Sequence, residues 1–228
     1  MFNKLIDPYP KLSYLAEDEL DFSPFSAVAV PVFPSDEIQI IKSRFITALV
    51  EFTKLDLNIE LANWPDFTAK AGEIIEIPIG NENLKRIYLV GVGESNNEDM
   101  RKAATSLGRR IKGNNVTLLS ALSNNKEQIV NQAISFILSN YQYTLKSEPK
   151  DKKPEFVIYG DFEEEIEHAQ IMATAVWQAR DLIHTPSNIK NPDWLAKQAT
   201  AMVSATKSSS LSISVKSGRA LKDFGGLI

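Results

Sequence analysis

Apolar and polar residues follow two different periods along most of this chain. Short apolar runs that predict buried strands lie at residues 27–33, 86–92, 116–119 and 156–159, with a partly alternating run at 73–79. Between them, apolar residues recur every three or four positions, which is typical of amphipathic helices. Strands that alternate with helices of this length imply βαβ units. We therefore predict an α/β fold with a mostly parallel sheet flanked by helices.

Side chains that suit helix N-caps mark where these helices should begin. The caps are Ser35, Asn96 or Asn97, Asn124 or Asn125, and Asp161, which has Glu164 three residues later as in a capping box. The stripes expected to be buried are, in chain order, Ile38, Ile41, Phe45, Ala48, Phe52 and Leu55; Met100, Ala104, Leu107 and Ile111; Ile129, Ala133, Phe136 and Ile137; and Ile166, Ala169, Ala173, Val176, Trp177 and Ile183.

Two segments near the N-terminus depart from this pattern of strands and helices. Residues 1–24 carry no clear pattern and are interpreted as a lead-in. Pro31 lies within the first apolar run, and because proline cannot donate a ladder hydrogen bond, we expect that strand to lie at a sheet edge or to bend there.

The C-terminal part begins with a loop between two prolines. Pro186 predicts that the preceding helix stops at His184–Thr185, and Asn191 followed by Pro192 predicts the start of another helix. Further expected elements are a helix with Leu195, Ala199, Met202 and Val203 inward, a half-buried strand at Leu211, Ile213 and Val215, a helical turn at Arg219–Phe224, and a turn entering a buried strand at Gly225–Ile228. Residues 144–154 are charged and contain two prolines, so we interpret them as a linker or an exposed crossing.

Composition narrows the possible functions. The 228 residues are 43% hydrophobic and 24% charged with a net charge of −4, so there is no basic field to favour nucleic acid. The chain has no cysteine and only two histidines, which excludes disulfides, thiolate metal sites and a histidine-rich metal site. No apolar run approaches a membrane span, and the first ten residues lack the core of a signal peptide. We expect a soluble cytoplasmic protein.

One glycine turn could bind phosphate. Gly91-Val92-Gly93 follows a predicted strand and precedes a predicted helix, a position where a helix N-terminus can hold an anion. The third glycine of the dinucleotide fingerprint is absent, and no Gly-Lys-Ser or Gly-Lys-Thr follows. A tight packing turn is the favoured interpretation.

The charged candidates also have simpler explanations. The acidic cluster of Asp161, Glu163, Glu164, Glu165 and Glu167 could hold a hard cation, but these residues spread over several faces of a helix start, where negative charge is favoured. The remaining candidates are a surface His168, a weak acid–base pair of His184 and Asp181, an ion pair of Arg180 and Asp181 at a domain junction, and a solvated basic group of Lys150, Lys152 and Lys153.

The loop region resembles a segment of the leucyl aminopeptidase (cytosol aminopeptidase) family. The residues that carry the resemblance are Arg180-Asp181-Leu182, Thr185-Pro186-Ser187-Asn188, Pro192, Leu195-Ala196 and, less strongly, Tyr141 and Tyr143 and the turns at Gly91–Gly93 and Gly225–Leu227. His184 stands where the family usually has Asn. The resemblance implies a macro-like N-terminal domain, here residues 1–150, and a linker helix with the truncated start of a metallopeptidase domain, here residues 151–228.

The resemblance also implies a function and its site. Family members are hexameric peptidases that hold two divalent metal ions, manganese, zinc or magnesium, and release N-terminal amino acids from peptides. Their ligand motifs contain Gly-Lys-Gly, Asp-Ser-Gly-Gly and Asp-Ala-Glu-Gly, and none of these occurs in this chain. We therefore assign no catalytic, cofactor-binding or metal-binding residue, and expect the chain alone to be inactive. The alternatives are a module that binds ADP-ribose or a similar ligand, and a domain that serves oligomer assembly.

Overall fold

The computed structural model describes residues 9–35, 38–143, 152–206 and 209–225. The chain divides into two compact units after Arg180, and each is described by itself. The predicted boundary at 150/151 falls in residues 144–151, outside the described part, so the assignment of 1–150 and 151–228 as domains stays a prediction.

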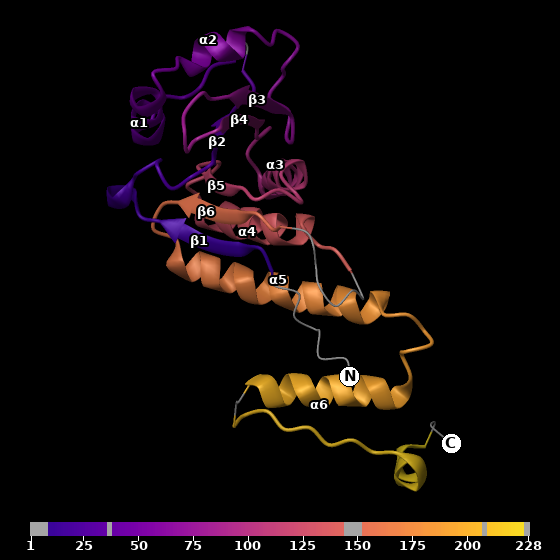
Figure 1. Ribbon diagram of the computed structural model, residues 1–228. Helices are drawn as coiled ribbons and strands as arrows, with labels where there is room; N and C mark the ends of the chain where they lie inside the picture. The colour runs from indigo at the N-terminus through magenta and orange to yellow at the C-terminus, as the bar shows by residue number, and fades with distance from the viewer. Residues whose placement is uncertain (1–8, 36–37, 144–151, 207–208, 226–228) are drawn as a thin grey trace. The chain divides into compact units, whose positions relative to one another are not determined.

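The first unit is built on a six-stranded sheet with the order β1-β6-β5-β2-β4-β3 (Figure 1). The strands are β1 Lys11–Leu15, β2 Ala27–Val32, β3 Ile74–Pro78, β4 Arg86–Gly91, β5 Thr117–Ser120 and β6 Glu155–Tyr159. Every neighbouring pair is parallel except β3 with β4. The predicted α/β fold with a mostly parallel sheet is confirmed.

Helices cover both faces of this sheet. They are α1 Arg44–Thr53, α2 Leu57–Ala62, α3 Asn97–Arg110, α4 Lys126–Ser139 and α5 Glu163–His184, with a short 3₁₀ turn η1 at Glu17–Glu19. One core cluster joins α3, α4 and α5 to the sheet, and the other joins α1 and α2 to the opposite face. Successive residues of β2 point into alternate clusters, because side chains of a strand alternate between faces.

The two central helices follow the sequence pattern closely. Asn96 and Asn125 cap α3 and α4, and each side-chain oxygen accepts hydrogen bonds from two backbone N–H groups of the first turn. All eight residues predicted to face inward from these helices are buried. Local capping and periodicity therefore suffice to place α3 and α4.

The first helix starts later than its pattern suggests. Ser43, not Ser35, caps α1, and its hydroxyl accepts from the Ile46 N–H at 3.2 Å. Ile41 is consequently outside the helix and 60% exposed rather than buried. Lys54 adopts a left-handed conformation with φ of 58°, which ends α1 and separates it from the unpredicted α2.

Pro31 lies in a central strand, so the expectation of an edge position is wrong. β2 pairs with β4 along Ala27–Val32 but with β5 only along Ala27–Ala29. Alternate residues of a parallel strand direct their N–H groups to the same neighbour, so Pro31 faces the β5 side beyond the end of that ladder. The missing N–H therefore costs no strand hydrogen bond.

Strand β1 lies in the segment interpreted as an unpatterned lead-in. It pairs in parallel with β6 at the edge of the sheet, and only Leu12 among its five residues is buried. A strand with one buried residue has no run or clean alternation to reveal it.

The expected burial is confirmed for four of the six residues predicted to face inward from helix α5. Ile166, Ala169, Ala173 and Trp177 are buried, whereas Val176 and Ile183 are 37% and 70% exposed. The helix begins at Glu163, so Asp161 lies one residue before the N-cap position rather than on it. It ends at His184, as Pro186 predicts.

The second unit contains α6 Pro192–Thr206 and a 3₁₀ turn, η2, at Gly218–Phe224. The predicted cap is confirmed, because Asn191 Oδ1 accepts from the Trp194 N–H at 2.8 Å. The expected burial of Leu195 and Met202 is wrong, and residues 211–215 form no strand because the described part of this unit offers no strand to pair with. Residues 226–228 lie outside the described part.

In the described residues, no helix is long and apolar enough to cross a membrane.

Trp177 anchors α5 to three other segments of the first unit. Its ring is 1% exposed and meets Tyr9 and Tyr141 edge-on, with centroids 5.2 and 5.0 Å away. The Lys153 ammonium lies 5.4 Å from the Trp177 ring centroid, within cation–π range. One side chain thus joins α5 to the start of β1, the end of α4 and the approach to β6.

Replacing Trp177 with alanine should lower the free energy of unfolding of the first unit by about 3–5 kcal/mol, because it removes a large, fully buried ring. Trp64, which is 52% exposed, is the matched control. Trp64→Ala should change stability by less than about 0.5 kcal/mol. Urea unfolding followed by circular dichroism measures both, and equal losses would contradict the anchoring role of Trp177.

Candidate functional site

The glycine turn after β4 uses its backbone donors internally. The Gly91 N–H donates to Glu73 O at 2.8 Å, Val92 to Val32 O at 3.1 Å and Gly93 to Ala69 O at 3.1 Å. Further along, the Glu94 N–H donates to Asp99 Oδ2 at 3.0 Å. An anion at this turn would have to displace these bonds, so the turn is not a ready phosphate cradle.

Both glycines are required by packing. A Cβ on Gly91 would lie 2.3 Å from Lys70 O, and one on Gly93 would lie 2.7 Å from Asp99 Oδ2. Gly93 also has φ of +55°, in the left-handed region that favours glycine. The interpretation as a tight packing turn is confirmed.

Two of the acidic residues at the start of α5, Glu163 and Glu165, interact with neighbouring side chains. Glu165 forms an ion pair with Lys126 of α4, with Oε1 and Nζ 2.7 Å apart. Glu163, together with burial and with Asp161 and Glu19, raises the pKa of the Tyr14 phenol. In residues 9–35, 38–143, 152–206 and 209–225, no group of three or more His, Asp or Glu side chains could hold a metal ion.

The two histidines lie at different places on α5, and the junction residues lie at its C-terminal end. His168 is exposed on α5, and His184 is the exposed last residue of that helix in the second unit. The Asp181 carbonyl accepts from the Thr185 N–H at 3.0 Å and from its hydroxyl at 2.7 Å, which closes the end of α5.

Arg180 braces α5 within the first unit. Its guanidinium donates to Leu138 O at 3.4 Å and lies 5.4 Å from the Tyr141 ring centroid. The expected ion pair of Arg180 with Asp181 stays a prediction. In the basic group, Lys153 contacts Trp177, Lys152 is exposed, and Lys150 lies outside the described residues.

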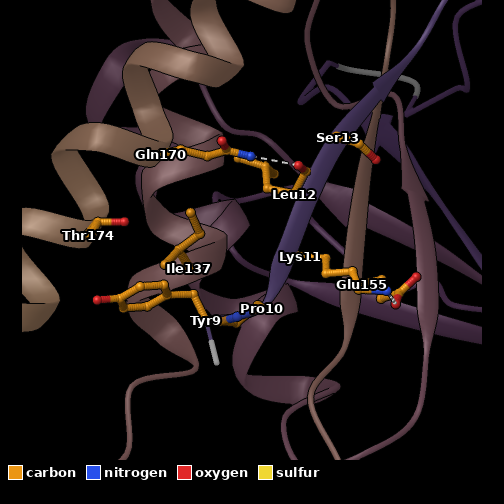
Figure 2. Close-up of a pocket in the computed structure, with 9 residues that line it drawn as sticks. All are labelled: Tyr9, Pro10, Lys11, Leu12, Ser13, Ile137, Glu155, Gln170 and Thr174. Atoms are coloured by element: carbon orange, nitrogen blue, oxygen red, sulfur yellow. Dashed lines mark hydrogen bonds and ion pairs between the residues drawn. The ribbon is translucent and has the colours of Figure 1, made fainter. Parts of the chain in front are cut away.

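One pocket of about 380 Å³ lies between β1 and α5, shown in Figure 2. Gln170 reaches from α5 to β1, where its Nε2 donates to Leu12 O at 2.7 Å, and Lys11 pairs with Glu155 at 2.7 Å. Its lining residues are Tyr9, Pro10, Lys11, Leu12, Ser13, Ile137, Glu155, Gln170 and Thr174. Only Lys11 and Glu155 among them carry charge, and these two side chains pair with each other.

The sequence could not reveal this pocket, because its wall is the unpredicted strand β1. The hydrogen bond from Gln170 joins residues 158 positions apart, and no local pattern signals such a contact.

Comparison with known proteins finds a family whose N-terminal domain is similar to part of this chain. Residues 53–149 match the model described as the cytosol aminopeptidase family, N-terminal domain. A probable cytosol aminopeptidase of Aquifex aeolicus is 31% identical over 151 residues, which cover 61% of this chain and 31% of that protein. The chain is similar to the N-terminal region of the leucyl aminopeptidase family.

Other leucine aminopeptidases are similar over more of the chain. Leucine aminopeptidase 2, chloroplastic, of rice (Oryza sativa subsp. japonica) is 23% identical over 226 residues, covering 86% of this chain and 36% of the relative. The chain thus spans about a third of the length of the curated relatives it matches.

Two solved structures share the fold. The bottromycin maturation enzyme BotP aligns with a TM-score of 0.67 and 18% identity, covering 88% of this chain and 41% of that one. A tomato leucine aminopeptidase mutant aligns with a TM-score of 0.66 and 20% identity, covering 88% and 43% of the two chains.

Gly91→Ala should destabilise the first unit by about 1–3 kcal/mol, because the new Cβ overlaps the Lys70 carbonyl in a packed region. Gly80→Ala is the matched control, since nothing lies within 4 Å of the added Cβ there. Thermal unfolding of both variants measures the difference. A Gly91→Ala protein as stable as Gly80→Ala would show that close packing does not require the glycine.

Proposed function

We propose that this chain is the N-terminal portion of a di-metal leucyl aminopeptidase that releases N-terminal amino acids from peptides. The observation that carries the proposal is the match of residues 53–149 to the N-terminal domain of the cytosol aminopeptidase family. The names of the relatives, which are cytosol and leucine aminopeptidases, supply the reaction class. The α/β unit would then support an active site built elsewhere in the enzyme.

The metal centre belongs, in this proposal, to the part of the enzyme outside this chain. Two divalent ions, manganese, zinc or magnesium, would activate water and stabilise the developing oxyanion there. The described residues do not fit such a centre, because they gather no group of three potential ligands. The chain alone is accordingly proposed to be inactive, with no catalytic, cofactor or metal residue of its own.

The remaining proposals follow the family. Residues 1–150 would form a macro-like domain, and residues 151–228 a linker helix with the start of the peptidase domain. The enzyme would be cytoplasmic, would assemble as a hexamer and would act on peptides rather than nucleic acid. The turn at Gly91–Gly93 gives no support to ADP-ribose binding, since its N–H groups are already bonded to the backbone.

The purified chain should release no p-nitroaniline from leucine-p-nitroanilide when Mn²⁺ or Zn²⁺ is added, because its described residues hold no metal centre. The protein captured from its natural source with an antibody against residues 152–206 should hydrolyse the same substrate, and a chelator should abolish that activity. Absorbance of released p-nitroaniline measures both arms.

Tomato leucine aminopeptidase is the positive control for the assay, and the antibody without extract is the blank. Metal-dependent hydrolysis by the purified chain would overturn the inactivity of the chain alone. Captured native protein without peptidase activity would overturn the proposed function itself.

A further inference from the structure

Helix α5 is apolar on two opposite faces. Ile166, Ala169, Ala173 and Trp177 are buried against the sheet. We define the outer face of α5 as Ile171, Met172, Ala175, Val176 and Ala179, all of which are exposed. Ile171 and Met172 are 69% and 46% exposed, so large apolar side chains meet solvent there.

The outer face is a continuous stripe rather than scattered residues. Positions 171, 175 and 179 are four apart, as are 172 and 176, so their side chains lie one above another. No charged residue occurs from Ala169 to Ala179, whereas the first turns of α5 carry several glutamates. A contiguous exposed apolar patch of this kind typically marks an interaction site. Something outside the first unit is therefore expected to cover this face.

Exposed apolar side chains concentrate toward the C-terminal end of the described chain. Of the fourteen large exposed apolar residues, ten lie from Ile171 onward. The ten are Ile171, Met172, Val176, Ile183, Leu195, Met202, Leu211, Ile213, Val215 and Phe224. A second copy could bind anywhere on the surface, but a continuation of the polypeptide would contact the segments next to it.

The relatives are much longer than the part that matches this chain. The chain covers 31% of the Aquifex aeolicus protein and 36% of the rice protein, so about two thirds of each lies outside the match. The alignments with the two solved structures cover 88% of this chain but only 41% and 43% of the chains in those structures. Aminopeptidases of this family therefore carry a large additional part.

We propose that the outer face of α5 is the docking surface for the metallopeptidase part of the enzyme. The inference rests on the proposed function and adds the surface by which this unit holds its peptidase partner. The partner surface must be apolar and uncharged, because Ile171, Met172 and Val176 would lose most of their contact with water on docking.

Methionine oxidation tests the proposal without an activity assay. Dilute hydrogen peroxide oxidises methionine according to its exposure. Met172 reports on the outer face, and Met100, which is fully buried in α3, is the internal control. The oxidation rate of each is measured by peptide mass spectrometry in the purified chain and in the native protein from its source, whose mass and peptidase activity are recorded in the same preparation.

Met172 should be oxidised at least about tenfold more slowly in the native enzyme than in the chain alone, while Met100 stays slow in both. In the full-length enzyme, Ile171→Glu should restore fast oxidation of Met172, whereas the control Glu167→Gln on the same helix should not. In the purified chain, Ile171→Glu should leave thermal stability unchanged, because the side chain is 69% exposed.

Equal rates for Met172 in the chain and in an active native enzyme would overturn the docking surface while leaving the proposed function standing. Protection of Met172 in the purified chain that rises with concentration would assign the face to a second copy. Protection of Met172 in the purified chain at every concentration would mean that another part of the same chain covers the outer face of α5. Both of these results would overturn the proposal. A native protein of 25.4 kDa without activity would instead remove the proposed function.

Discussion

The packing of α5 against the sheet is the contact on which the first unit depends. Trp177 lies between two tyrosines and under a lysine, and these partners come from the start of β1, the end of α4 and the approach to β6. Gln170 adds a hydrogen bond to the β1 backbone. The edge strand β1 has little burial of its own, so α5 stabilises it from one side and β6 from the other.

Several polar groups of the same unit bond to other residues of that unit. The glycine turn bonds its N–H groups to neighbouring backbone, Glu165 pairs with Lys126, and Arg180 contacts Leu138 and Tyr141. Catalysis needs groups held ready for a substrate instead. The hydrogen bonds and ion pairs named here all join parts of the unit to one another.

The sequence predicted the elements whose signals are local. Asn96 and Asn125 cap helices through hydrogen bonds to residues two and three positions away, and the buried stripes of α3 and α4 lie within single helices. Pro186 and Asn191 mark the end of α5 and the start of α6 in the same way. The loop at 180–196 also carried the family resemblance.

Elements that depend on distant partners escaped prediction. Strand β1 is specified by β6, which lies more than a hundred residues later, and the pocket beside it depends on Gln170. Pro31 is tolerated in a central strand only because β5 stops short of it. The apolar stripe at Leu211, Ile213 and Val215 has the period of a strand, but a strand needs a neighbour, and the described part of the second unit provides none.

The central claim is that this chain is one part of a longer aminopeptidase whose chemistry lies beyond it. The intact mass of the protein purified from its natural source tests that claim most directly. We predict a mass two to three times 25.4 kDa, since the matched part spans 31% of the Aquifex aeolicus relative and 36% of the rice relative. A native mass of 25.4 kDa would contradict it.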